Sequence, residues 1–332
     1  MPWFDLPLPD LRSYRTGTEE PPGLDEWWQG QLDQARALAE PPVVTRYEAA
    51  GYGPVEVYDV AFSGARGDRI RAWYIRPPGG PDGTPVVVKF IGYGGGRGLP
   101  ADHLLLPAVG YPLFVMDTRG QGGRWTLGAT GDQPGGGPEY SSVMTRGLDD
   151  PEGYYFTRLF TDAVRAVETA ADLTGTGLAG PGDGAGQARI AVTGVSQGGG
   201  LALAAAALLG DTVAVCHADV PFLCDIHRGV TVAPDMPYAE VAAFLAHQVD
   251  YEATALDTLR YVDCALLARR ITARCLLSVG LMDTICPPST VFAAYNEITA
   301  AKDIAVFSFG VHAVPPAHVQ RQLRHLRTHL PA

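Results

Sequence analysis

Short apolar runs, each about the length of one β-strand, recur through the middle and the end of the chain. They occupy residues 86–91, 113–117, 190–193, 213–218, 275–279 and 304–307. Segments with a helical pattern lie between them, at residues 156–171, 197–209, 288–299 and 317–329. Apolar runs that alternate with helices are typical of strands buried on both faces of a parallel sheet. The pattern predicts an α/β fold with a doubly wound, mostly parallel sheet and helices on both faces.

The first part of the chain has a different pattern. Residues 55–62 and 70–75 alternate between apolar and polar positions, with a Gly-rich turn between them, which predicts an antiparallel hairpin. Before the hairpin, residues 24–38 form an amphipathic stretch that carries Trp27, Trp28 and Leu32. We expect residues 1–50 to form an N-terminal cap that covers part of a larger body.

Two insertions interrupt the alternation of strands and helices. Residues 125–151 are Gly-rich and longer than an ordinary loop, so we expect them to serve the site or an interface. Residues 224–269 have a mostly helical pattern. The chain has no internal repeats, and we expect its 332 residues to form a single domain with these two insertions.

Composition narrows the classes of partner. Apolar residues make up 46% of the chain and charged residues 18%, as in ordinary compact enzymes. A net charge of −11 without a basic patch argues against nucleic-acid and membrane binding. The longest apolar helix candidate, residues 201–209, is about half of the ~20 residues that a membrane span needs. Five cysteines without metal-ligand spacing, and a start without a secretory pattern, predict a cytoplasmic protein without disulfides or a bound metal.

The sharpest motif is Gly194-Val195-Ser196-Gln197-Gly198, which follows an apolar strand and precedes an Ala- and Leu-rich helix. A serine on a tight turn between strand and helix needs very small neighbours, and the turn exposes its hydroxyl. The same turn aims the backbone N–H of Gln197 at the oxyanion that forms on an attacked carbonyl. A chance match is the alternative in so Gly-rich a chain, but the context favours Ser196 as a nucleophile.

The carboxylate partner should follow a later strand of the same sheet. Asp283 follows the apolar run at 275–279 and precedes Cys286-Pro287-Pro288, where a helix begins. In that place it would orient a histidine and stabilise its charged form. The alternative is a helix-capping aspartate, because Asp often precedes helices.

Eight histidines compete for the role of base. His312 comes directly after the last predicted strand, in the order that this type of hydrolase requires. The others fall inside the final helix (His318, His325, His329), on a strand (His217), or before Asp283 (His103, His227, His247). We expect His312 to be the base.

A second oxyanion donor should come from the loop after the first parallel strand, Gly92-Tyr93-Gly94-Gly95-Gly96. The glycines would let the backbone approach a substrate closely. A phosphate cradle is the alternative for such a run. No Lys-Ser/Thr pair follows it and the G-x-G-x-x-G spacing fails, so nucleotide binding is disfavoured.

Several segments together resemble the acetyl xylan esterase/cephalosporin C deacetylase family of carbohydrate esterases, within the α/β-hydrolase superfamily. The resemblance runs through nearly the whole chain. It is carried by Phe4-Asp5-Leu6-Pro7-Leu8, Arg119-Gly120-Gln121-Gly122, the motif around Ser196, Asp219-Val220-Pro221-Phe222-Leu223-Cys224 and the segment from Ser278 through Asp283 to Asn296.

The resemblance implies an α/β-hydrolase fold and a serine esterase without cofactors that removes acetyl groups from short xylo-oligosaccharides and from cephalosporin C. It makes Ser196, Asp283 and His312 the triad, and the backbone amides of Tyr93 and Gln197 the oxyanion hole. Tyr93 and Pro221 would wall a small acyl pocket. It also implies a cytoplasmic homo-hexamer in which residues 125–151 are an interface segment.

The chain departs from the family at two places. Ile91 stands where the family commonly has histidine, and Ala313 stands where it commonly has glutamate. Two other functions remain as alternatives: another α/β-hydrolase, such as a peptidase or a lactone hydrolase, and a catalytically silent scaffold of the same fold. Arg119 is expected to form a buried ion pair that supports its loop, with shaping of the site as the alternative.

Overall fold

A nine-stranded sheet forms the centre of the part of the chain that the computed structural model describes, residues 4–48, 51–79, 83–132, 142–175 and 190–332. The strand order is β1-β2-β3-β5-β4-β6-β7-β8-β9. The strands are β1 (Val43–Arg46), β2 (Glu56–Ser63), β3 (Arg69–Arg76), β4 (Val86–Phe90), β5 (Leu113–Met116), β6 (Ile190–Val195), β7 (Val213–Asp219), β8 (Arg274–Gly280) and β9 (Lys302–Phe307).

The sheet is antiparallel at its beginning and parallel from β5 to β9. Strands β1, β2 and β3 pair antiparallel, and β3 pairs antiparallel with β5. The pairs β5–β4, β4–β6, β6–β7, β7–β8 and β8–β9 are all parallel. Parallel neighbours place their carboxyl ends at one edge of the sheet, so the loops that follow β4, β6, β7, β8 and β9 meet there.

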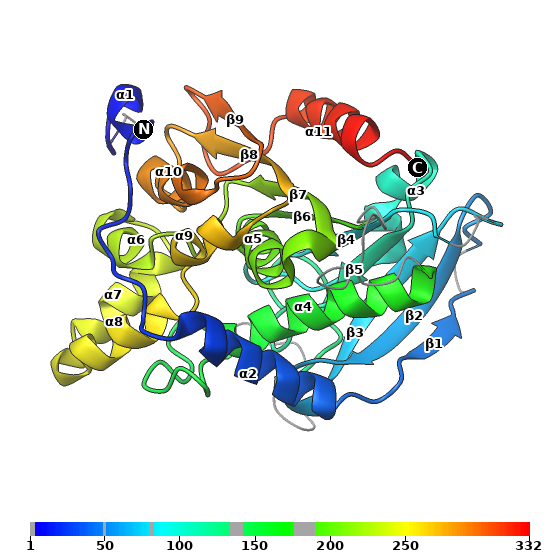
Figure 1. Cartoon of the computed structure of the whole chain (residues 1–332), viewed down its shortest axis with the longest axis horizontal. Coiled ribbons are helices and arrows are strands. Elements are labelled where there is room, and N and C mark those ends of the chain that lie inside the picture. The colour runs from blue at the N-terminus through cyan, green and yellow to red at the C-terminus, as the bar shows by residue number, and fades with distance from the viewer. Residues whose placement is uncertain (1–3, 49–50, 80–82, 133–141, 176–189) are drawn as a thin grey trace.

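Helices precede, connect and follow the strands, and they cover both faces of the sheet. They are α1 (Leu8–Leu11), α2 (Leu24–Ala37), α3 (Leu105–Ala108), α4 (Tyr155–Thr174), α5 (Gln197–Leu209), α6 (Ile226–Val232), α7 (Tyr238–Leu245), α8 (Glu252–Arg260), α9 (Cys264–Leu267), α10 (Pro288–Glu297) and α11 (Pro316–His329). Short 3-10 turns lie at Ala65–Gly67, Pro100–His103, Gly210–Thr212, Val249–Tyr251 and Ala268–Arg270. In Figure 1, α4 and α5 lie in front of the sheet with α2 alongside α4, and the C-terminus ends near α3.

Side chains alternate between the two faces along each strand. Val86, Val88 and Phe90 of β4 belong to the larger hydrophobic cluster, with α4, α5 and α10. We call this side the α5 face. The opposite side, the α11 face, carries a smaller cluster that includes Val87, together with Leu326 of α11.

The N-terminal segment differs in one respect from the expectation of a cap. Helix α2 lies where the amphipathic stretch predicts a helix, and it buries Leu24, Trp28 and Leu32. Residues 43–46 add β1 to the edge of the sheet, so part of the expected cap is sheet. The four residues of β1 are all exposed and carry no apolar–polar alternation, which explains why the pattern did not reveal this strand.

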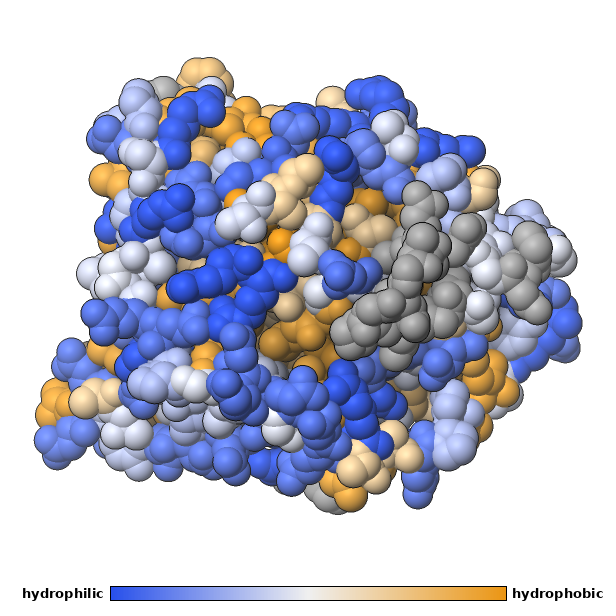
Figure 2. Space-filling view, viewed as in Figure 1, coloured by the Kyte–Doolittle hydropathy of each residue, from blue (hydrophilic) through white to orange (hydrophobic). Residues whose placement is uncertain are grey.

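The surface of the described residues is mostly hydrophilic on the face shown in Figure 2, with hydrophobic atoms visible between polar ones toward its middle. Within the same residues, none of the helices has the length and apolar character needed to cross a lipid bilayer.

The segment 224–269 contains helices α6, α7, α8 and α9.

Candidate active site

Ser196 occupies a sharp turn between β6 and α5. Its backbone has φ 60° and ψ −121°, a left-handed conformation that is costly for a residue with a side chain. The turn needs glycine on both sides: a Cβ on Gly194 would lie 2.2 Å from the carbonyl carbon of Gly198. The Ser196 side chain stands at the carboxyl edge of the sheet, and the residue is 8% exposed.

Asp283 and His312 come from the loops after β8 and β9 and meet at the same edge. Nδ1 of His312 lies 2.8 Å from Oδ2 of Asp283. The other oxygen, Oδ1, accepts hydrogen bonds from the backbone N–H groups of Ile285 and Cys286, both at 2.9 Å. Asp283 is fully buried, whereas the side chain of His312 is 19% exposed. The buried carboxylate therefore fixes the orientation of a ring that still reaches the surface.

Cys286 connects this pair to the serine. Its thiol is fully buried, and burial together with the charge of Asp283 raises the pKa of the thiol, while a hydrogen bond with the Ser196 side chain acts in the opposite direction. Its backbone N–H already binds Asp283. Cys286 therefore touches both Ser196 and Asp283, a contact that sequence reasoning missed because cysteine has no place in the expected motif.

The two expected oxyanion donors, the backbone amides of Tyr93 and Gln197, lie on neighbouring loops. Gln197 begins α5, and the first N–H groups of a helix have no acceptor within it. Among the described residues, no protein acceptor pairs with the Tyr93 N–H. Nε2 of Gln197 donates to the carbonyl of Ile91 at 3.1 Å, which ties the helix start to the loop after β4.

Gln121 joins the loop after β4 to the start of α5. Its Oε1 accepts from the Gly94 N–H at 2.6 Å, and its Nε2 donates to Oε1 of Gln197 and to the hydroxyl of Tyr155, both at 2.9 Å. All three side chains are buried. Gln121 lies inside a segment that carries the resemblance, but its supporting role is visible only in three dimensions.

Tyr93 is also tied to the helical insertion. Its hydroxyl lies 2.9 and 2.7 Å from the two carboxylate oxygens of Glu240 on α7, and it accepts the N–H of Val143 at 2.9 Å. Burial and the Glu240 carboxylate raise the pKa of Tyr93. From the other side, Nε1 of Trp125 donates to the Tyr93 carbonyl at 2.9 Å. The insertions thus hold the loop that carries one candidate donor.

Pro221 lies in the loop after β7, packed against the start of α5. A Cβ on Gly199 would lie 3.1 Å from its Cα. The next residue, Phe222, donates its N–H to the Ser196 carbonyl at 3.0 Å, and its ring meets that of Tyr93 edge-on at 6.3 Å between centroids. Pro221 and Tyr93 therefore both lie near the serine turn.

Arg119 is a buried structural residue, as expected. Its guanidinium is fully buried and contacts Asp162 at 2.6 Å, Asp68 at 2.9 Å and Asp132 at 3.6 Å. Its carbonyl accepts the hydroxyl of Tyr155 at 2.5 Å. The prediction of a supporting ion pair is confirmed.

The acetyl xylan esterase (AXE1) family model matches residues 1–330 of the chain. The chain belongs to this family. The predicted family and fold are confirmed, and the protein is a carboxylic ester hydrolase with the α/β-hydrolase fold. Family membership also supports an acetyl ester as the type of bond that it cleaves.

Two solved structures of acetyl xylan esterases resemble the whole chain. The enzyme of Paenibacillus sp. R4 is 32% identical, with a TM-score of 0.85, and the match covers 98% of this chain and 100% of that one. Acetyl xylan esterase 1 of Thermoanaerobacterium sp. JW/SL YS485 is 33% identical, with a TM-score of 0.82, covering 97% and 98%. The acetyl esterase Axe7A of Xylanibacter ruminicola is 26% identical over 298 residues, which are 89% of this chain and 64% of that protein.

Several of the other histidines have partners other than Asp283. His103 contacts Lys89, His217 contacts His325, and His227 binds the carbonyl of Leu256. Of the chain's histidines, His312 is the one whose ring meets Asp283. Among the described residues, no group of three His, Cys, Asp or Glu side chains is arranged to hold a metal ion.

Proposed function

We propose that this protein is a serine esterase that hydrolyses acetyl esters of small substrates, with acetylated xylo-oligosaccharides and cephalosporin C as its substrate class. The observation that carries the proposal is the contact between His312 and buried Asp283 at the sheet edge where Ser196 occupies its strained turn. A nucleophile, a base and an orienting carboxylate on adjoining strand ends are the parts that acyl transfer needs.

In the proposed reaction, Oγ of Ser196 attacks the acetyl carbonyl while Nε2 of His312 takes its proton. Nδ1 of His312 then holds its hydrogen toward Asp283, which stabilises the imidazolium. The bond between the acyl carbon and the sugar oxygen breaks, and His312 returns the proton to the leaving alcohol. Water repeats the sequence on the acetyl-enzyme and releases acetate.

The backbone amides of Tyr93 and Gln197 are proposed to hold the oxyanion. The proposal is supported by the hydrogen bonds that join their loops through Gln121 and Ile91. Donors held in place before the reaction stabilise developing charge without reorganisation, and one such donor contributes on the order of 10²–10³ in rate.

The test is acetate release from acetylated xylobiose and from cephalosporin C, measured side by side for the wild type and Ser196→Ala. We expect release by the wild type and a fall in kcat of several orders of magnitude in the variant. Ser13→Ala, on the exposed N-terminal segment, is the matched control and should behave as the wild type. Equal release by Ser196→Ala would overturn the assignment of the nucleophile.

Labelling with a fluorophosphonate separates the mechanism from the substrate. Wild type that is labelled at Ser196 but releases no acetate from either substrate would remain a serine hydrolase with another ester as substrate. Wild type that is neither labelled nor active would favour a silent scaffold. Cleavage of peptide substrates at rates comparable to acetyl esters would favour a peptidase.

The size of the acyl pocket is tested with a series of esters. Because Tyr93 and Pro221 both lie near the serine turn, we propose that they limit the acyl group to acetate. Acetate esters should be hydrolysed faster than the matching butyrate esters. Equal rates for the two would contradict a narrow pocket.

We also propose that the chain assembles as a homo-hexamer through the insertion at residues 125–151, of which 133–141 lie outside the described residues. The proposal is supported by Trp125 and Leu127, which are 60% and 62% exposed at the start of this insertion. Sedimentation of the wild type should give a hexamer, and Leu127→Glu should give smaller species. A monomeric wild type would refute the proposal without affecting the esterase mechanism.

A further inference from the structure

A cavity of about 270 Å³ lies on the α11 face, behind the serine turn. Its walls come from β4, β6 and β7, from α3 and from α11. Gly194 and Val195 line it just before Ser196, and Val314 lines it just after His312, whereas the three triad candidates are not among the described residues of its lining. The cavity is therefore a neighbour of the candidate active site and not its acyl pocket.

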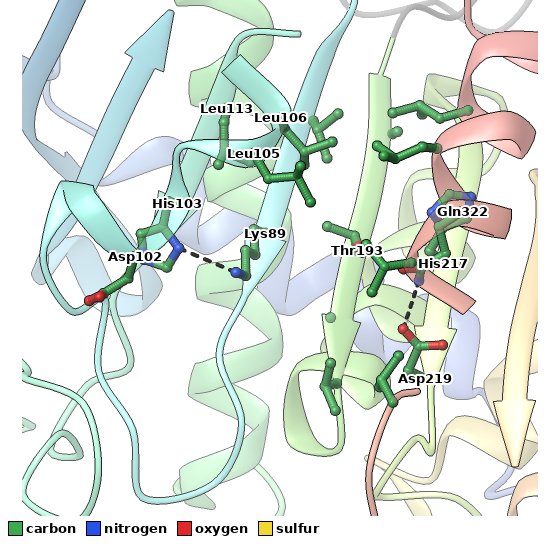
Figure 3. A pocket seen from close by; sticks show the side chains of 18 residues that line it. Lys89, Asp102, His103, Leu105, Leu106, Leu113, Thr193, His217, Asp219 and Gln322 are labelled. Atoms are coloured by element: carbon green, nitrogen blue, oxygen red, sulfur yellow. Dashed lines mark hydrogen bonds between the residues drawn. The ribbon is translucent and has the colours of Figure 1, made fainter. Parts of the chain in front are cut away.

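The cavity exists because this part of the sheet is thinly covered. Helix α3 has only four residues, and it presents Leu105 and Leu106 to the space. Helix α11 approaches from the other side with Val319 and Leu323. Neither helix reaches across the strands between them, so a gap remains (Figure 3). Most of the residues that line this gap are apolar.

One wall carries a lysine. Nζ of Lys89 on β4 lies 3.2 Å from Nδ1 of His103, and Nε2 of His103 lies 2.7 Å from the carbonyl of Arg97. A carbonyl only accepts, so Nε2 carries the hydrogen and Nδ1 accepts one from Lys89. An ammonium has three N–H groups, and the described residues provide an acceptor for one of them.

The surroundings of these two groups disfavour charge. Burial lowers the pKa of Lys89, although the carboxylate of Asp102 acts in the opposite direction. Burial, and then the positive charge of Lys89, lower the pKa of His103 to about 4, so its ring is neutral near pH 7. A negative charge placed beside Lys89 would supply the missing acceptor and stabilise the ammonium.

The opposite wall offers hydrogen bonds but no unpaired carboxylate. Asp219 lies there, with Oδ1 2.7 Å from Oγ of Ser278 and 2.9 Å from Nε2 of His318, and Oδ2 2.7 Å from Nε2 of Gln322. Thr193 and His217 stand beside it in Figure 3, across the cavity from Lys89. Each oxygen of Asp219 therefore accepts a hydrogen bond from a neighbouring side chain.

The geometry points to a second binding site in this cavity, for a small organic carboxylate whose apolar body lies between α3 and α11 and whose carboxylate binds Lys89. The volume is a little below the roughly 300–1,000 Å³ of drug-sized pockets, which fits a ligand of about ten non-hydrogen atoms. An apolar wall with one charged group is the usual form of such sites. The site is separate from the acyl pocket of the proposed function.

The test uses octanoate as the probe and octanamide as its uncharged match. Lys89 and Lys302 are the two lysines of the chain, so protein labelled with ¹³C at lysine Cε gives one signal from each. The signal that disappears in Lys89→Met is that of Lys89. Lys302 lies at the start of β9, does not line the cavity, and serves as an internal control.

We expect octanoate to shift the Lys89 signal saturably and to leave the Lys302 signal in place. Octanamide should bind at least about tenfold more weakly, because a charge-assisted hydrogen bond is lost. Leu106→Phe should abolish the shift by filling the cavity, and Leu104→Phe, beside it but outside the lining, should not.

Three results would overturn the inference: no shift of Lys89 with octanoate, equal affinity for octanamide, or unchanged octanoate binding in Leu106→Phe. The last would place octanoate elsewhere, including the acyl pocket. Because Leu106→Phe leaves the lysine intact, the inference stays testable even if Lys89→Met fails to fold. None of these results depends on esterase activity.

Discussion

The two faces of the central sheet are built from the same strands but are packed in different ways. On the α5 face, every residue from Leu201 to Ala206 is at most 1% exposed, and glycines bring α5 against the backbone of β4. On the α11 face, the strands present Lys89, Thr193 and His217 to a cavity. The first face fixes the serine turn by close backbone contact, and the second leaves space beside it. Close packing is therefore concentrated where a strained backbone must be held.

The largest effect is expected where the two faces meet at the carboxyl edge of the strands. Asp283→Asn keeps the shape of the side chain but offers an N–H to His312, which favours the wrong tautomer. We predict a fall in kcat of about 10⁴ on an acetyl ester, with the unfolding free energy little changed. Asp257→Asn, at a partly exposed ion pair on α8, is the control. A loss of less than about tenfold would argue against Asp283 as the orienting residue.

One added methyl group should disrupt the close packing of α5 against the sheet. A Cβ on Gly198 would lie 2.3 Å from the carbonyl oxygen of Phe90 on β4. To relieve this clash, the backbone of α5 or β4 would have to move. We predict that Gly198→Ala lowers the unfolding free energy in urea by about 3 kcal/mol. Gly30 lies on α2, and a Cβ there would meet no atom within 4 Å. Gly30→Ala should therefore raise the unfolding free energy by about 0.5–1 kcal/mol. Similar unfolding free energies for the two variants would show that α5 packs less closely against β4 than the geometry indicates.

A matched pair of leucines sharpens the comparison. Leu201 of α5 is fully buried, whereas Leu323 of α11 is half-buried beside an existing cavity. Leu201→Ala should cost about 3 kcal/mol of unfolding free energy, because it leaves a new void. Leu323→Ala should cost about 1 kcal/mol, because it removes less buried area. Urea titrations of both variants measure the difference, and equal costs would contradict the distinction between the faces.

The smallest difference between a variant and its comparison concerns pH and the α11 face. Burial, followed by the imidazoles of His325 and His318, lowers the pKa of His217 to about 3, compared with about 6.5 in an unfolded chain. The unfolded chain binds more protons between these values. The stability linked to neutral His217 is thus complete above pH 6.5 and is lost as the pH falls toward 3. The loss is about 1.4 kcal/mol at pH 5.5.

His217→Leu removes this titration. The decrease in unfolding free energy from pH 7.5 to pH 5.5 should be about 1.4 kcal/mol smaller in the variant than in the wild type. Contributions from groups that do not contact His217, such as Asp263, are the same in both proteins and cancel. His247→Leu, at an exposed position, should leave the pH dependence unchanged. A variant with the pH dependence of the wild type would contradict the lowered pKa.

The sequence predicted the parallel half of the fold well. The apolar runs from residue 86 onward match β4 to β9 within one or two residues at most ends, because strands buried on both faces must be apolar throughout. The serine motif identified the turn between β6 and α5, since only glycine fits at Gly194 and Gly198. Strand β1 was missed because an exposed edge strand carries no such pattern.

By itself the sequence determined the strand and helix pattern, the family and the candidates Ser196, Asp283 and His312, because each depends on local periodicity or on residues in a fixed order along the chain. Only the tertiary structure decided that Cys286 touches Ser196, that Glu240 holds Tyr93, and that a cavity with Lys89 lies behind the serine turn. These contacts join residues far apart in the chain. Local pattern says which face of an element is buried, but the space between two elements depends on how they pack.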